Sequence, residues 1–168
     1  MTAAPDPKAF RRVVGHYATG VTVITTVLPD GHRHAMTCNS FTSVSLDPLL
    51  VLFCAEKVAR FHEAVLQTGT WAVSVLSAEH ERTSSHFAVR GRDTADQFSW
   101  VPVTPGPVTG APVLEGALAV IECRTVSTTD AGDHTVVLGE VLGASVPAPD
   151  AEPLLYYQGG YRAVRSVG

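Results

Sequence analysis

Small hydrogen-bonding side chains crowd one stretch of the chain, from Thr37 to Ser45. A strand whose only role is to pack one face against the core alternates apolar and polar residues. This stretch instead carries hydroxyl and amide groups almost continuously, before the apolar run from Leu49 to Cys54. A polar edge beside a buried strand suits a flat, heteroatom-rich ligand such as the isoalloxazine ring of a flavin. From the residues alone, an equal alternative is that the hydroxyls bond the local backbone.

Two further segments carry groups that can bind or orient a ligand. Lys57 and Arg60, in the turn after the apolar run, are the cations nearest to the polar edge in sequence, and they suit a phosphate. In the Gly132-Asp133-His134 turn, Asp133 can accept a hydrogen bond from the imidazole and orient it. Both segments also have a structural interpretation, because charged turns are usually solvated and a histidine that begins a strand is more often structural than catalytic.

The remaining candidate ligands indicate no metal site. His32 and His34 share one face of an expected strand, but without a nearby carboxylate or cysteine they are interpreted as exposed polar positions. Cys38, Cys54 and Cys123 are odd in number and widely spaced, which is typical neither of a disulfide framework nor of zinc ligands. We interpret all three as small buried side chains in a reducing compartment, and we expect a cytoplasmic protein.

The elements that must position these residues are mostly strands. Asp6-Pro7 predicts the start of a helix with one apolar face, which Gly20 ends. Further helices are expected at 60–67 and 79–89, and residues 90–112 are expected to form an irregular loop. The predicted strands are 21–27, 34–39, 49–54, 71–76, 117–127 and 134–146, with a final pair within 154–164 around Gly159-Gly160. A connection of six residues, 128–133, joins the two long strands as a hairpin.

Many strands, few helices and no regular β–α alternation favour an antiparallel barrel with peripheral helices over a parallel sheet. The 168 residues suit a single domain, 1–168, with its core at about 10–164. No glycine-rich dinucleotide fingerprint follows a strand, so a Rossmann site is not supported.

Composition excludes several other classes of function. The formal net charge is −4 and the basic residues form no stripe, so binding to nucleic acid or to an anionic membrane has no electrostatic support. The chain is 45% hydrophobic, yet no window of about 18 apolar residues predicts a membrane span. Residues 1–9 lack the pattern of a signal peptide.

Four segments, in order along the chain, resemble the flavin reductase-like split-barrel family, the reductase components of two-component flavin monooxygenases. Asn39 to Pro48 resembles the family's central motif, and Gly20 to Thr26 resembles its first strand. Gly132-Asp133-His134 resembles its Gly-Asp-His turn, and Leu154 to Tyr161 resembles its C-terminal segment. The resemblance covers about residues 10–161, and it implies a mainly β, six-stranded antiparallel split barrel (an FMN-binding split barrel) with peripheral helices, working as a homodimer.

The resemblance also implies roles for individual residues. His134 faces the nicotinamide and is the residue implied in catalysis. Either Tyr157 or Tyr161 closes over the flavin or the nicotinamide. Val58 and Ala59 depart from the family, which often has a hydroxyl for the flavin phosphate there. The residues implied to bind cofactor are Met36, Thr37, Cys38, Asn39, Ser40, Ser43, Cys54, Ala55, Lys57, Arg60, Phe87, Ala88, Arg90, Asp133, Tyr157 and Tyr161.

The implied activity is an NAD(P)H-dependent flavin reductase. It transfers hydride from NADH or NADPH to FMN or FAD and supplies reduced flavin to a separate monooxygenase. The absence of an obvious arginine pair for a 2′-phosphate favours NADH. The alternative is a non-catalytic flavin- or heme-binding split-barrel protein acting as carrier or sensor, which needs no nicotinamide face. A purely structural barrel is the third interpretation.

Overall fold

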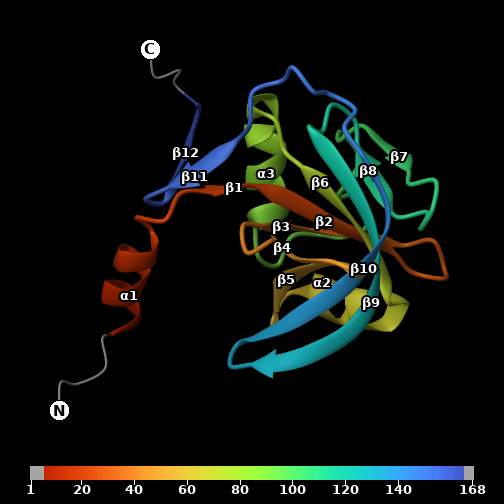
Figure 1. Cartoon of the computed structure of the whole chain (residues 1–168), viewed down its shortest axis with the longest axis horizontal. Helices are drawn as coiled ribbons and strands as arrows, with labels where there is room; N and C mark the ends of the chain where they lie inside the picture. Colours follow the sequence, from red (N-terminus) through yellow and green to blue (C-terminus); the bar gives the residue numbers. More distant parts are fainter. Residues whose placement is uncertain (1–5, 165–168) are drawn as a thin grey trace.

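A computed structural model describes residues 6–164 and is built mainly of strands (Figure 1). The helices are α1 (Pro7–Val14), α2 (Arg60–Thr68) and α3 (Glu81–Ala88), with a 3-10 turn η1 (Ala78–His80) before α3. The strands are β1 (Thr19–Gly20), β2 (Thr22–Val27), β3 (Arg33–Cys38), β4 (Thr42–Leu46), β5 (Leu49–Glu56), β6 (Thr70–Val75), β7 (Val103–Pro105), β8 (Pro112–Leu114), β9 (Ala119–Ala131), β10 (His134–Ser145), β11 (Leu155–Tyr157) and β12 (Gly160–Arg162).

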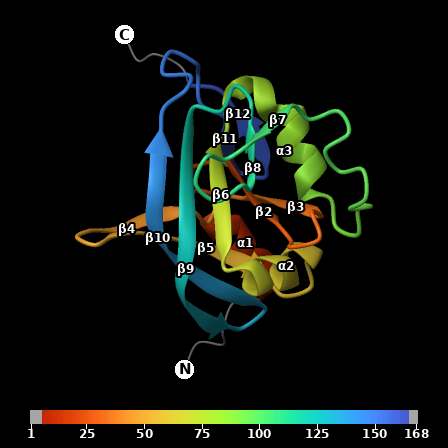
Figure 2. The same ribbon diagram turned by 90° about the vertical axis from the view of Figure 1, so that its right-hand side faces the viewer.

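The main sheet has the order β3-β2-β6-β9-β10-β5-β4, and all of its neighbouring strands are antiparallel. β3 and β4 are its two edges, yet they are consecutive in the chain, and the step from Cys38 to Thr42 spans at most about 14 Å. The sheet is therefore rolled into an open barrel, as Figures 1 and 2 show. It has seven strands rather than six, because the polar stretch 42–46 pairs with β5 as β4.

The core lies on both faces of β2, whose successive side chains point in opposite directions. Ile24 packs inside the barrel with Phe53 and Trp71. Val23 packs on the other face with Phe87 of α3 and Phe98 of the following loop. The predicted inner face of α2 is confirmed, since Phe61, Ala64 and Val65 are its buried residues.

The prediction of the first helix is correct at its start and wrong at its end. Asp6 caps α1 by accepting hydrogen bonds from the backbone N–H groups of Lys8 and Ala9, at 2.8 and 3.0 Å. The helix ends at Val14 rather than near Gly20, with Gly15 at its C-cap. No α1 residue is buried, because the helix stands apart from the barrel on the left of Figure 1.

Three connections differ from the prediction. β9 continues to Ala131, so the long hairpin turns through Gly132 and Asp133 alone; the exposed polar end of β9 hides the pairing from a hydrophobic pattern. The C-terminal turn is Gln158-Gly159, one residue earlier than predicted, and both residues have positive φ, 49° and 77°. The expected loop 90–112 contains β7 and the start of β8, which form a small sheet of their own.

Candidate functional site

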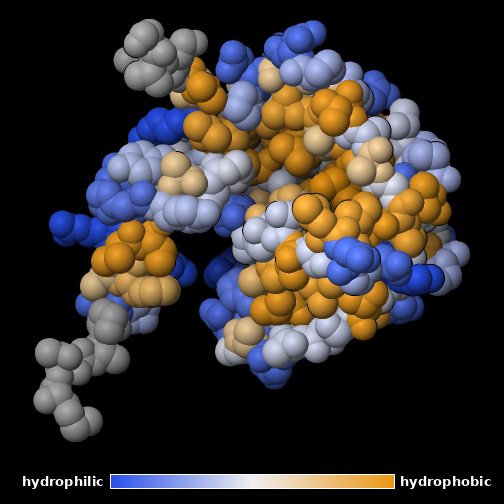
Figure 3. All heavy atoms as spheres, in the orientation of Figure 1, coloured by the Kyte–Doolittle hydropathy of each residue, from blue (hydrophilic) through white to orange (hydrophobic). Residues whose placement is uncertain are grey.

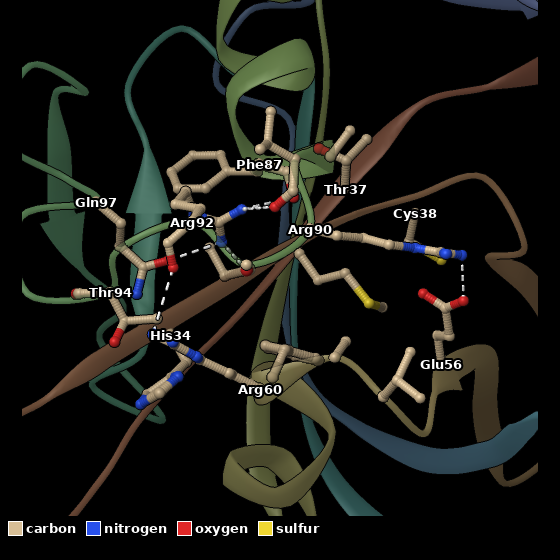
Figure 4. Close-up of a pocket in the computed structure, with 18 of the residues that line it drawn as sticks. His34, Thr37, Cys38, Glu56, Arg60, Phe87, Arg90, Arg92, Thr94 and Gln97 are labelled. Carbon is tan, nitrogen blue, oxygen red and sulfur yellow. Dashed lines mark hydrogen bonds and ion pairs between the residues drawn. The ribbon is translucent and has the colours of Figure 1, made fainter.

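A cavity of about 470 Å³ opens between β3, the end of β5, the start of α2 and the end of α3 (Figure 4). This volume falls within the usual range for small-molecule sites. Eleven of the residues singled out from the sequence line it: Met36, Thr37, Cys38, Asn39, Ser40, Cys54, Arg60, Phe87, Ala88, Arg90 and His134. The fold thus brings the polar edge, the turn after β5, the end of α3 and the tip of the β9–β10 hairpin to one place.

Six singled-out residues lie outside the cavity: Ser43, Ala55, Lys57, Asp133, Tyr157 and Tyr161. Ser43 is exposed on β4, the outer edge strand. Ala55 is fully buried, because alternation along β5 turns it into the core while Cys54 and Glu56 face the cavity. The Lys57 ammonium bonds Asp130 on β9, at 2.6 Å.

The two tyrosines have separate surroundings. Tyr161 packs against the core, and its hydroxyl lies 2.8 Å from Oγ of Ser84 on α3. Tyr157 meets His16 edge-on, beyond the end of α1. Tyr161 therefore reaches the wall of the cavity through α3, whereas Tyr157 joins the C-terminal hairpin to the segment after α1.

Two hydroxyls of the polar edge already have partners. Thr37 Oγ1 donates to the Ser84 carbonyl of α3, at 2.6 Å, so its hydroxyl meets a ligand only as an acceptor. Ser40 Oγ accepts the Cys54 backbone N–H at 2.9 Å and lies 3.0 Å from Cys38 Sγ. Both hydroxyls thus bond backbone groups of other elements, while the side chain of Asn39 is exposed at the rim.

The two ends of the cavity differ in charge, as Figure 4 shows. At one end Arg90 forms an ion pair with Glu56, whose register partner across the β5–β10 pair is His134. At the other end the Arg60 side chain extends toward His34, beside Arg92. Glu56 is the only carboxylate that lines the cavity within the described residues, so the second end is basic.

The interpretation of both His32 and His34 as exposed polar positions is wrong for His34. His32 lies before β3 and pairs with Asp30 at 3.0 Å, whereas His34 lies in β3, is half-buried and lines the cavity. Burial lowers the pKa of His34, and the nearby charges of His32, Arg92 and Arg60 lower this pKa further, against the opposing effect of Asp30.

His134 stands at the hairpin tip with a fixed ring. Its Nδ1 lies 2.7 Å from Asp133 Oδ1, and this hydrogen bond is the main cause of the lowered pKa of Asp133. When Nδ1–H donates to the carboxylate, Nε2 of the neutral ring is an acceptor. Asp133 thus contacts the imidazole rather than the cavity.

Sequence reasoning missed half of the lining: His34, Ala35, Glu56, Val58, Ala59, Phe61, Val89, Gly91, Arg92, Thr94 and Gln97. Some of these adjoin singled-out residues, so neighbourhood in sequence was an available signal. Arg92 and Gln97 had no such signal, because they lie in the loop after α3 and act through contacts distant in sequence.

A second cavity, of about 530 Å³, lies between the β7–β8 hairpin and the β9–β10 strands. Its buried carboxylate, Glu122, accepts the backbone N–H groups of Val108 and Thr109 and the Thr109 hydroxyl, at 2.7–3.1 Å. That carboxylate is occupied in holding the loop. We therefore place the candidate site in the first cavity, which has cationic side chains and exposed polar groups.

Cys38 and Cys123 are buried, as predicted, and burial raises the pKa of both thiols, that of Cys123 to about 12. Cys54 is only partly buried and faces the cavity. Among residues 6–164, no three His, Cys, Asp or Glu side chains gather as a metal site, and no helix is long and apolar enough to cross a membrane.

Comparison with known proteins bears on this site. Residues 14–165 match the family described as flavin reductase like domain. The chain is 42% identical over 165 residues to the reductase subunit HsaB of a flavin-dependent monooxygenase from Mycobacterium tuberculosis, covering 98% of this chain and 86% of that one. Two solved structures are also similar: the Streptomyces globisporus NADH:FAD oxidoreductase SgcE6 in complex with NAD and FAD fragments (41% identity, TM-score 0.88, 98% of each chain), and BorF, the flavin reductase component of a bacterial two-component tryptophan halogenase (39% identity, TM-score 0.89, 96% and 100%).

Proposed function

Because the chain belongs to the flavin reductase like domain family, we propose that it is an NADH-dependent flavin reductase whose active site is the cavity between β3, β5 and α3. The resemblance found in the sequence, the split-barrel fold and the reductase class are confirmed by these relatives. One observation carries the placement of the site: His134, at the tip of the β9–β10 hairpin, lines the same cavity as the polar edge from Met36 to Ser40.

The residues of the cavity fit a flavin. The backbone of the polar edge and the Asn39 amide offer donors for ring carbonyls, and Phe87 and Ala88 supply an apolar wall. The basic end suits the flavin phosphate, and Arg60 is its candidate ligand, whereas Lys57 is held by Asp130. Ala59 caps α2 without a side-chain hydrogen bond, so backbone N–H groups replace the missing hydroxyl at Val58 and Ala59.

The hydride donor then approaches from the side of His134. A bound flavin accepts the hydride at N5. The protein's own part is to hold two rings in contact and to exclude water, which is a matter of distance and orientation. His134, steadied by Asp133, is placed to bond or stack on a carboxamide. Arg90 is drawn to this end by Glu56, so we propose that it contacts the nicotinamide nucleotide rather than the flavin tail.

We also propose that the protein is a homodimer. The apolar side chains of α1 and the segment after it are exposed: Phe10, Val13, Val14 and Tyr17. An amphipathic helix with no buried residue needs another surface to cover its apolar face. Figure 3 shows a hollow between α1 and the rest of the molecule. On β4 and β5, Leu46 and Leu49 are further exposed apolar residues. In a closed, two-fold dimer, a second copy of the chain covers the apolar face of α1 and the exposed leucines of β4 and β5.

Light scattering at micromolar concentration tests this pairing. We expect a dimer for the parent and a shift toward monomer for Val13→Glu, with Val126→Glu, an exposed valine on β9, as the matched control. A monomeric parent, or a Val13→Glu variant that remains dimeric, contradicts the role given to α1.

Three finer assignments belong to the same proposal. Reduced flavin passes to a separate monooxygenase; in support, the similar HsaB is the reductase subunit of a flavin-dependent monooxygenase, and BorF is the reductase component of a two-component halogenase. NADH is the donor and FAD or FMN the acceptor, in line with the description of SgcE6 for NADH and FAD. A cytoplasmic location is in keeping with three free cysteines.

The decisive experiment adds NADH to the purified protein with FMN or FAD, without oxygen. A reductase bleaches the flavin at a rate that saturates in both substrates. A carrier or sensor, the alternative class, binds flavin and shows no turnover, and that result contradicts the proposal. Readmitting oxygen restores the flavin absorbance, which separates reduction from destruction of the cofactor.

A further inference from the structure

The loop after α3 holds a half-buried guanidinium at the wall of the cavity. Nη2 of Arg92 donates to the Ala35 carbonyl of β3 at 2.7 Å, and to Gln97 Oε1 at 2.9 Å. Nη1 of the same side chain lies 3.0–3.3 Å from carbonyls at the end of α3, those of His86, Phe87 and Val89. One planar group therefore joins the end of a helix to the edge of a sheet.

None of these acceptors is a carboxylate. Every hydrogen-bond partner of the Arg92 side chain within residues 6–164 is a neutral oxygen, and its Nε–H is buried with no partner there. Burial lowers the pKa of Arg92. A half-buried cation without a carboxylate partner contributes little to stability, since neutral side chains can pack in its place.

Gln97 completes the connection. It is 2% exposed, and its amide donates to the Arg33 carbonyl at 2.6 Å while its oxygen accepts from Arg92. Arg33 and Ala35 are alternate residues of β3, the edge strand, so their carbonyls face outward where no neighbouring strand bonds them. Arg92 and Gln97 take the place of that missing strand.

We infer that Arg92 is a positioning residue for hydride transfer. It acts by holding the Phe87–Val89 wall at a fixed distance from the β3 wall, which carries Met36 and Thr37. Thr37 and Ser84 join the same two elements one turn earlier. A flavin ring bound between these two walls would be held at a spacing that the guanidinium helps to fix, and this spacing would govern its distance from the hydride donor. This inference rests on the proposed function.

The test compares Arg92→Lys and Arg92→Met with the parent protein. A lysine keeps the charge but cannot bond both walls at once with a planar fork. We expect both variants to bind FMN and to reduce it, at saturating NADH, by roughly tenfold to a hundredfold more slowly. The absorption spectrum of bound FMN should broaden, because the ring is less uniformly held. Arg124→Met, which removes an exposed arginine paired with Glu140, is the matched control and should keep the parent rate.

Thermal unfolding and flavin titration accompany the rates. If Arg92→Lys reduces FMN at the parent rate with an unchanged spectrum, and only its melting temperature falls, Arg92 is a purely structural residue and the inference is wrong. If Arg92→Met does not fold, the rates of FMN reduction by Arg92→Lys and Gln97→Met test the inference instead. If both variants reduce FMN at the parent rate, the inference is wrong. Loss of NADH-dependent reduction in the parent itself would instead contradict the proposed function.

Discussion

The Thr37 hydroxyl, on the polar edge of the cavity, donates its hydrogen bond to the Ser84 carbonyl of α3 at 2.6 Å. Ser84 is fully buried, and its own hydroxyl lies 2.8 Å from that of Tyr161 in the C-terminal hairpin. A residue expected to serve the ligand thus also fixes a helix to the edge of the barrel.

Replacing Thr37 with valine should therefore affect stability as well as binding. The variant leaves the Ser84 carbonyl without this donor, so the free energy of unfolding should fall by about 1 kcal/mol. Thr37→Ser keeps the hydroxyl and is the matched control, expected to lie close to the parent. Denaturant unfolding measures both. Equal stability of the valine and serine variants would show that the bond to Ser84 contributes nothing.

Trp71 leaves no room for a side chain at Gly139. A Cβ built on Gly139 would lie 2.3 Å from Cζ2 of the fully buried indole. Gly139→Ala should therefore destabilise the protein by about 1–3 kcal/mol through overpacking. Gly20→Ala, where a Cβ has open space, is the control and should change stability little. Chemical denaturation of both variants tests the difference, and similar midpoints would contradict it.

A helix or strand could be predicted from the sequence where its pattern of apolar and polar residues is local. The strands that bury one or both faces could be predicted from the sequence. β2 consists of Val, Ile and Thr, and β5 is mostly apolar. β4 was not, because its polar residues are mostly exposed and only pairing with β5 makes it a strand. The apolar spacing correctly predicted a helix at α1, but no surface within residues 6–164 covers its apolar face.

The candidate site divides in the same way. The run from Met36 to Ser40 and the Gly132-Asp133-His134 turn were visible because each is contiguous. Arg92 and Gln97 bond backbone carbonyls of β3 from a distant loop, and such bonds leave no periodicity in the sequence. His34 was placed correctly in a strand, but it lines the cavity because α2, α3 and the following loop come together beside it, and that packing leaves no pattern in the sequence.

His34 should make stability depend on pH. Burial is the main cause of its lowered pKa, so the folded protein binds this proton less readily than the unfolded chain. Its contribution is then complete above the ordinary pKa of about 6.5, and is lost as the pH falls through the folded-state pKa. Unfolding at pH values on both sides of that range should show a smaller fall for His34→Asn than for the parent. Parallel curves for the two proteins would rule out this role for His34.

Asn39 and Ser40 should separate ligand binding from folding. Ser40→Ala leaves the part-buried Cys54 N–H without its acceptor, so stability should fall by about 1 kcal/mol. Asn39 is exposed at the rim, so Asn39→Ala should leave stability unchanged and weaken flavin binding by about 0.5–1.5 kcal/mol, the net value of one hydrogen bond. Fluorescence titration with FMN and FAD measures the affinity. Parent affinity in Asn39→Ala would remove this amide from the proposed flavin contacts.

His134→Ala should slow the reduction of flavin by NADH while leaving flavin affinity almost unchanged. The imidazole lines the end of the cavity near Glu56, away from the basic end proposed for the flavin phosphate, so its removal loosens the nicotinamide rather than the flavin. Hydride transfer depends steeply on geometry, and a small displacement of the donor is enough to reduce the rate. Rapid-mixing reduction at several NADH concentrations, beside a flavin titration, measures both quantities.

Two further variants sharpen this experiment. Asp133→Asn keeps a partner for the imidazole but removes the charge, and it should slow reduction less than His134→Ala, because Asp133 acts only through the ring. His62→Ala is the control: its Nε2 lies 2.8 Å from the Thr135 hydroxyl, next to His134 in sequence, and it does not line the cavity. A parent rate in His134→Ala would make His134 a structural residue of the turn. Lost flavin binding with normal hydride transfer in the remaining complex would place it on the flavin side instead.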